Sequence, residues 1–160
     1  MLGKAVVLFG VLLALFAITQ SHGHIKNGQG KDFRGYVDVN GTTFFIDTAE
    51  YYRDEAQVAC NALNMTLITF QAEEKYNVVY NWLYNNGYEF NWLWTGALRG
   101  TNSSVWTWEP TGEEFTYFRW GSNQPSINDD RYPLCINFRV LSLGWDDDYC
   151  NNALIGYICQ

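Results

Sequence analysis

The sequence has few of the residues on which most catalytic and metal sites depend. It contains two histidines, His22 and His24, and both lie near the N-terminus. None of its four cysteines belongs to a Cys-x-x-Cys pair. A zinc site, a haem attachment site and a Ser/His/Asp triad are therefore poor explanations of its function. Basic residues are also scarce, at 10 against 17 acidic residues, so the chain repels phosphate backbones and nucleic acid is not an expected partner.

Long apolar runs are equally scarce, because only residues 5–18 form one. This run is shorter than the roughly 20 residues that cross a membrane. It follows Lys4 and precedes small polar residues, which is the order typical of a signal peptide. We expect residues 1–23 to be a signal peptide that is cut after Ser21 or Gly23, with an uncleaved anchor as the alternative. The prediction is a secreted, extracellular protein without stable membrane insertion.

Beyond this segment the sequence predicts one domain of the α+β class. Residues 24–35 are expected to form a loose N-terminal arm, and residues 36–160 the domain itself. Asn40-Gly41 lies between two runs of β-branched and aromatic residues, which predicts a hairpin. Apolar residues then recur at helical spacing, which predicts two helices, around residues 56–63 and residues 72–83.

After Gly87 the helical pattern gives way to short aromatic segments separated by turn residues. They predict strands at residues 92–95, 105–108, 115–120, 134–138 and 155–159. Helices followed by antiparallel strands indicate the α+β class. Residues 121–130 interrupt the strands with a polar stretch that Cys135 closes, and a loop of this length is typical of a functional segment.

The remaining covalent signals fit a secreted protein. Four cysteines, Cys60, Cys135, Cys150 and Cys159, predict two disulfides, with three possible connectivities. Asparagine sequons predict glycosylation sites at Asn40, Asn64 and Asn102.

Six short motifs resemble the C-type lectin domain, between residues 36 and 160. They are Glu55-Ala56-x-x-x-Cys60, Trp94-Thr95-Gly96-Ala97, Trp106-Thr107-Trp108, Trp120-Gly121-Ser122-Asn123-Gln124-Pro125-Ser126, Trp145-Asp146-Asp147 with Cys150, and Ile158-Cys159-Gln160. The resemblance implies a C-type lectin-like fold with two helices, antiparallel sheets and a long ligand loop. It also implies the pairs Cys60–Cys159 and Cys135–Cys150. We expect Trp94, Trp108, Trp120 and Trp145 to be core residues, because a small domain buries large aromatic side chains.

The same resemblance implies a site for Ca²⁺ and sugar. Gln124 and Ser126, on either side of an expected cis Pro125, and the strand pair Asp146 and Asp147 match the family's calcium and sugar ligands. Gln124-Pro125-Ser126 is similar to the family's galactose-type Gln-Pro-Asp pattern, with a hydroxyl in place of the carboxylate. A second acid is missing at Pro133, so the site holds less charge than the full pattern, and Ca²⁺ affinity depends on ligand charge.

Two functions remain open at this point. The first is a secreted lectin that binds glycans or glycoproteins through Ca²⁺ and prefers galactose-type sugars. The alternative is a lectin-like domain whose degenerate calcium site leaves it binding protein partners. An enzyme is not expected, because glycan hydrolysis needs two carboxylates across a cleft and nothing in the sequence fixes such a pair.

Overall fold

The computed structural model describes residues 30–153 and 155–160. The predicted signal peptide and the first half of the predicted arm, residues 24–29, therefore lie outside the described residues. The elements along the chain are β1 (Arg34–Val39), β2 (Thr42–Tyr51), α1 (Arg53–Ala62), α2 (Glu73–Asn85), β3 (Leu93–Arg99), β4 (Trp106–Trp108), β5 (Glu113–Glu114), β6 (Leu134–Arg139), the 3₁₀ turn η1 (Val140–Ser142), β7 (Gly144–Tyr149) and β8 (Ile155–Cys159). Within that part of the chain, no helix has the length and apolar character needed to span a bilayer.

The hairpin predicted at Asn40-Gly41 joins β1 to β2. Val39 pairs with Thr42, and the two turn residues have φ of 53° and 80°. A two-residue turn of this kind needs positive φ at both positions, which asparagine and glycine tolerate. β1 starts at Arg34, two residues ahead of the predicted domain start, because Arg34 already pairs with Asp47 of β2. The ring of Phe33, just before it, packs edge-on against Tyr88 at 5.5 Å.

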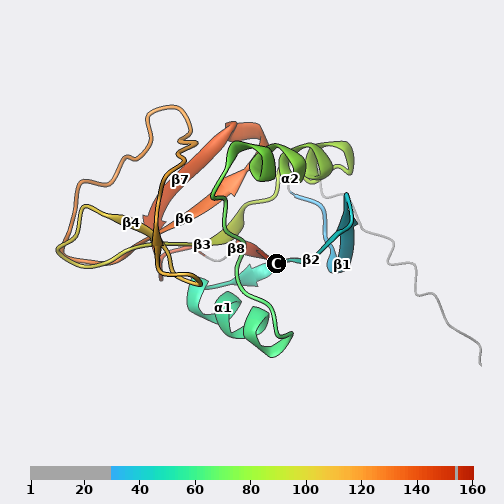
Figure 1. Ribbon diagram of the computed structural model, residues 1–160, viewed down its shortest axis with the longest axis horizontal. Helices are drawn as coiled ribbons and strands as arrows, with labels where there is room; N and C mark the ends of the chain where they lie inside the picture. Colours follow the sequence, from blue (N-terminus) through green and yellow to red (C-terminus); the bar gives the residue numbers. More distant parts are fainter. Residues whose placement is uncertain (1–29, 154) are drawn as a thin grey trace, which may run out of the picture.

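The strands form one sheet in the order β1-β2-β8-β3-β4-β5, with β6 joined to β3 and β7 joined to β6. All pairs are antiparallel except β3 and β8, which are parallel and so depart from the predicted antiparallel arrangement. β8 returns the C-terminus to the middle of the sheet, between β2 and β3 (Figure 1). β7 is the outermost strand of its branch, so one of its edges is open to the loop that precedes β6.

The segment predicted as a strand at residues 115–120 forms almost no ladder. β5 ends at Glu114, and Trp120 forms only an isolated bridge with Trp145. The reason is that Phe115 turns into the core and stacks on Trp108 at 4.2 Å. Packing of the aromatic ring, rather than strand pairing, fixes this stretch of backbone.

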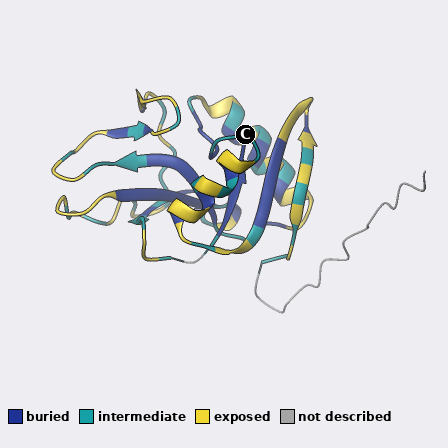
Figure 2. Ribbon diagram, turned by 90° about the horizontal axis from the view of Figure 1, so that it is seen from below, coloured by how far each residue is buried: buried dark blue, intermediate teal, exposed yellow. Residues whose placement is uncertain are grey.

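The two predicted helices lie on opposite sides of the sheet (Figure 1). α1 buries Ala56 and Cys60, whereas α2 buries Tyr76, Val79 and Leu83. These are residues of the two apolar stripes that the helical spacing predicts. Each helix therefore covers its own hydrophobic cluster, and buried residues continue along the central strands between them (Figure 2).

Aromatic side chains fill much of this core. Trp94, Trp108 and Trp145 are completely buried, as predicted, and Trp120 is partly buried against Trp145. Trp145 sits where β7 meets the long loop, so the residue that precedes the predicted ligand pair is fixed by packing.

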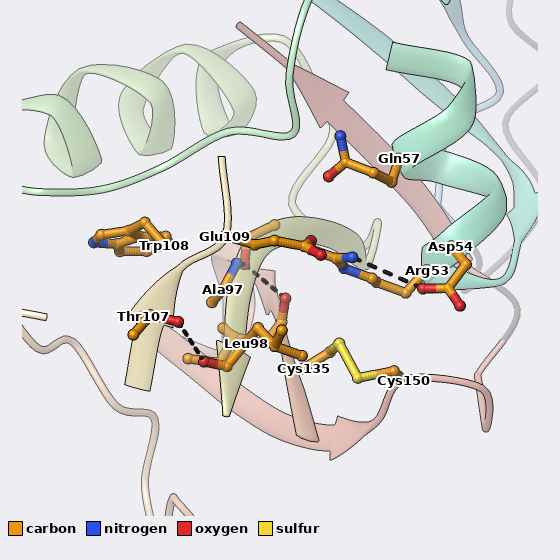
Figure 3. Close-up of polar contacts among 12 residues, drawn as sticks. Arg53, Asp54, Gln57, Ala97, Leu98, Thr107, Trp108, Glu109, Cys135 and Cys150 are labelled. Atoms are coloured by element: carbon orange, nitrogen blue, oxygen red, sulfur yellow. Dashed lines mark hydrogen bonds and ion pairs between the residues drawn. A yellow bond between two sulfur atoms is a disulfide. The ribbon is translucent and has the colours of Figure 1, made fainter. Parts of the chain in front are cut away.

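Two disulfides close the domain, and their pairing is the one that the resemblance implies. Cys60–Cys159 ties α1 to β8 with Cα atoms 5.6 Å apart, and Cys135–Cys150 ties β6 to the end of β7 at 5.0 Å. Beside the second bridge, the buried guanidinium of Arg53 contacts the carboxylate of Glu109 (Figure 3). This ion pair joins the start of α1 to the turn after β4.

Candidate functional site

The long polar loop begins along the open edge of β7. Trp145 N–H donates to the carbonyl of Arg119 over 2.7 Å, and Gly121 N–H donates to the carbonyl of Trp145 over 2.9 Å. The backbones approach so closely here that a Cβ on Gly144 would lie 2.4 Å from the nitrogen of Gly121. Glycine at this position is therefore required by the contact itself. The contact brings the Gln124-Pro125-Ser126 segment beside Asp146 and Asp147.

Asp147 fastens this loop to the strand. Its Oδ1 accepts the backbone N–H of Ser126 at 2.6 Å and the Ser126 hydroxyl at 3.3 Å. Its Oδ2 accepts the backbone N–H of Ile127 at 2.9 Å. The side chain of Asp147 is almost fully buried, and Ile127 packs against the main hydrophobic cluster. Hydrogen bonds between a carboxylate and backbone N–H groups are the strong, charge-assisted kind.

Asp146 faces the other way, because successive side chains of a strand point to opposite faces. It pairs with Asn137 of β6, so these two side chains share one face of the sheet. A cavity of about 260 Å³ opens on this face, and five of its lining residues carry side-chain oxygens: Gln124, Asn137, Asp146, Asp147 and Asp148. Trp92, Ala153 and Ile155 supply the apolar part of its wall.

Two amide oxygens of this cavity have no partner in the described part of the structure. They are Oε1 of Gln124 and Oδ1 of Asn137, and both atoms are buried from solvent. Burial also raises the pKa of the Asp146 carboxyl, while the guanidinium of Arg139 lowers it and Asp147 and Asp148 raise it. The cavity is thus rich in hydrogen-bond acceptors and in partly buried negative charge.

The far end of the loop is held by contacts of a different kind. Arg99 donates to the carbonyl of Asp129 over 2.7 Å, and Asn102 N–H donates to the carbonyl of Asp130 over 2.7 Å. The carboxylate of Asp129 accepts from Arg131 and from the hydroxyl of Tyr149. Hydrogen bonds from Arg131 hold the pKa of Asp129 far below its usual range. Asp129 therefore serves the loop itself and does not face the cavity of Asp146.

The structure brings together most, but not all, of the predicted site. Gln124, Asp146 and Asp147 line the cavity, and Ser126 contacts Asp147. The predicted cis bond precedes Pro125. Pro133 lines a separate hollow beside Tyr132 and Tyr149. In residues 30–153 and 155–160, no three Asp, Glu, His or Cys side chains gather closely enough to hold a metal ion by themselves.

The sequence prediction missed Asn137, which lines the cavity, and Arg139, whose charge acts on Asp146. The alternation along β6 contains the signal: Leu134, Ile136 and Phe138 enter the main hydrophobic cluster, which leaves Asn137 and Arg139 on the opposite face. That alternation alone does not say which residue of β7 pairs with Asn137 or with Arg139.

The sequence is similar to a known protein family and to two known proteins. A family model described as "Lectin C-type domain" matches residues 50–160. Lymphocyte antigen 75 of Mus musculus is 26% identical over 147 residues, which cover 91% of this chain and 8% of that protein. The lectin subunit alpha of Sarcophaga peregrina is 25% identical over 130 residues, covering 76% of this chain and 45% of that protein. The chain thus spans less than half the length of either relative.

Solved structures share the fold. The structure described as an SPL-1–GlcNAc complex matches with a TM-score of 0.62 and 21% identity, covering 78% of this chain and 90% of that one. The structure described as the Ca²⁺-independent C-type lectin SPL-2 from Saxidomus purpuratus matches with a TM-score of 0.60 and 19% identity, covering 78% and 89%. At these identities the likeness concerns the fold alone.

Proposed function

Because the chain belongs to the C-type lectin domain family, we propose that it is a secreted lectin that binds galactose-type glycans with the help of a weakly held Ca²⁺ ion. The family is a carbohydrate-binding, non-enzymatic fold. The observation that carries the proposal is that Gln124, Asp146 and Asp147, three of the four predicted ligand residues, line one cavity beside the long loop.

The donor set of this cavity fits Ca²⁺, which takes six to eight oxygen ligands and accepts amide as well as carboxylate oxygens. Gln124 Oε1 is buried without a partner, so a cation would satisfy it. Asp146 and Asp147 would supply the fixed negative charge, and Ser126 would add a hydroxyl. A bound Ca²⁺ ion supplies positions at which two neighbouring sugar hydroxyls replace water.

The residues of the chain also support a galactose-type preference and weak calcium binding. Gln124-Pro125 is similar to the family pattern for galactose-type sugars, and the amide of Gln124 can donate a hydrogen bond to a sugar hydroxyl. Ser126 and Pro133 lack the carboxylates of the full pattern. Since Ca²⁺ affinity follows ligand charge and rigidity, we expect a dissociation constant of roughly 10⁻⁴ to 10⁻³ M.

A second function has its own supporting observation. Both oxygens of Asp147 already accept hydrogen bonds from the loop, so the loop is fastened by protein atoms alone. A loop held in this way suits a lectin-like domain that uses its surface to bind a protein. The SPL-2 structure is described as that of a calcium-independent lectin, so the fold does not by itself require the ion.

Binding to a glycan array, with calcium and with EDTA, separates these functions. We expect galactose-terminated and N-acetylgalactosamine-terminated glycans to bind in millimolar calcium and to be released by EDTA, and mannose-terminated glycans to bind less. Galactose binding that persists in EDTA would contradict the role of the ion. If the protein bound no glycan on the array but did bind a defined protein that carries no glycans, the second function would be favoured.

Secretion and glycosylation are part of the same proposal. Asn40, Asn64 and Asn102 are all exposed at left-handed turn positions, with φ between 53° and 55°. Such turns leave the asparagine side chain accessible to the glycosylation machinery. Expression in a eukaryotic secretory host should yield a protein cut after Ser21 or Gly23 whose mass falls on treatment with an N-glycosidase. An intact Met1 in the membrane fraction would contradict secretion.

A further inference from the structure

Asn137 is a buried polar residue that the known pattern of ligands does not use. It lies on β6 between two neighbours, opposite Trp94 of β3 and Asp146 of β7. Only 5% of its surface is exposed, yet its Oδ1 has no partner in the described residues. Its side chain lines the cavity that Gln124 and Asp146 also line.

An orphaned acceptor at this depth is costly, because a buried carbonyl oxygen without a hydrogen bond loses its solvation and gains nothing in return. A leucine has the same branched shape and would carry no such cost. Oδ1 of Asn137 is also accompanied by a second orphan, Oε1 of Gln124, and by the carboxylate of Asp146 on the same wall. Three neighbouring acceptors call for a ligand that is a cation or carries several donors.

We infer that Oδ1 of Asn137 is an oxygen ligand of the Ca²⁺ ion and makes up for one of the acids that Ser126 and Pro133 lack. This inference rests on the proposed function, since it concerns the same ion. The ligand set then combines the amide oxygens of Gln124 and Asn137 with the carboxylates of Asp146 and Asp147. Such a mixture of amide and carboxylate oxygens is ordinary for Ca²⁺ and unusual for smaller, more demanding cations.

One cation of the protein lies close to this set. The guanidinium of Arg139 stacks over the ring of Trp92 at 4.4 Å and is near enough to Asp146 to influence it. Its positive charge opposes a second cation, which is a further reason for weak binding. The stacking gives the guanidinium a stable place against the indole.

The test is calcium titration calorimetry on the secreted protein and three variants. Asn137→Leu removes the oxygen and keeps the branched shape of the side chain, and Asn137→Asp adds a charge at the same place. Asn81→Asp is the control for Asn137→Asp, because it makes the same substitution at an exposed position of α2. We expect Asn137→Leu to weaken calcium binding by about tenfold or more and Asn137→Asp to strengthen it by a similar factor, with the control unchanged.

The rise in melting temperature on adding calcium gives a second readout that does not involve sugar. It should be smaller in Asn137→Leu than in the wild type, although the calcium-free variant melts no lower, because an orphaned acceptor has been removed. Wild-type affinity in Asn137→Leu, with a normal melting temperature, would overturn the role of Asn137 and leave the lectin proposal standing. A wild type that takes up no calcium at millimolar concentration would overturn both.

Discussion

The backbone N–H of Ser126 donates to Oδ1 of Asp147 over 2.6 Å, and this bond fixes the ligand loop to the edge of the sheet. The same carboxylate also accepts the N–H of Ile127, so two consecutive loop amides end on one side chain. Asp147 therefore has a structural role that does not depend on metal or sugar. Its loss should affect the loop itself, in addition to the proposed ligand site.

We predict that Asp147→Ala loosens the loop in addition to abolishing calcium and sugar binding. Two amides and a hydroxyl lose their acceptor, which should lower the free energy of unfolding by about 1 to 3 kcal/mol. Urea denaturation measures the loss, and limited proteolysis should cut within residues 121–133. Asp148→Ala, at the next residue of the same strand, is the control. Among the described residues its carboxylate accepts hydrogen bonds from Tyr149 and Asn152 and none from the loop, so the loop should stay resistant.

Ser126→Asp should strengthen calcium binding at a cost to the calcium-free protein. The Ser126 hydroxyl lies 3.3 Å from Oδ1 of Asp147, so a carboxylate at this position faces another at close range. The two carboxylates repel each other without Ca²⁺, whereas both can bind the ion when it is present. We expect a lower melting temperature in EDTA, a higher one in millimolar calcium, and about tenfold tighter binding in calorimetry. Equal melting temperatures in both buffers would contradict this.

Arg139→Gln should raise calcium affinity severalfold, because it removes the positive charge nearest to Asp146 while keeping a polar side chain. The gain should shrink as salt is added, since charge interactions that reach solvent are screened. Arg34→Gln is the matched control, as Arg34 pairs with Asp47 at the other end of the sheet. An unchanged calcium titration of Arg139→Gln would show that the guanidinium does not act on the site.

The stability of the domain should fall at pH values above the ordinary pKa of tyrosine. Burial raises the pKa of Tyr76 and of Tyr157 to about 12, from an ordinary value near 10. Between these values the unfolded chain loses the phenolic protons and the folded chain keeps them, so the free energy of unfolding decreases as pH rises from 10 to 12. Urea midpoints across this range measure the effect, and Tyr157→Phe should make the fall less steep, because one of the two most strongly shifted phenols is removed.

Several features followed from short stretches of sequence. The Asn40-Gly41 turn, the buried stripes of α1 and α2, and the buried tryptophans depend on interactions within a few residues or on side-chain size. The order of six motifs implied the fold and both disulfides, which the structure confirms. The segment at residues 115–120 was wrongly predicted as a strand, because aromatic content alone does not distinguish a ladder from a loop anchored by Phe115.

The sequence by itself determined that this protein has a lectin-type domain with Gln124, Ser126, Asp146 and Asp147 near its long loop. Only the tertiary structure decided what each one touches. Asp147 fastens the loop while Asp146 turns to the opposite face, where it meets Asn137. The physical reason is that alternation along a strand is a local property, whereas the side chain opposite is set by the register between β6 and β7 and by the path of the loop along the edge of β7.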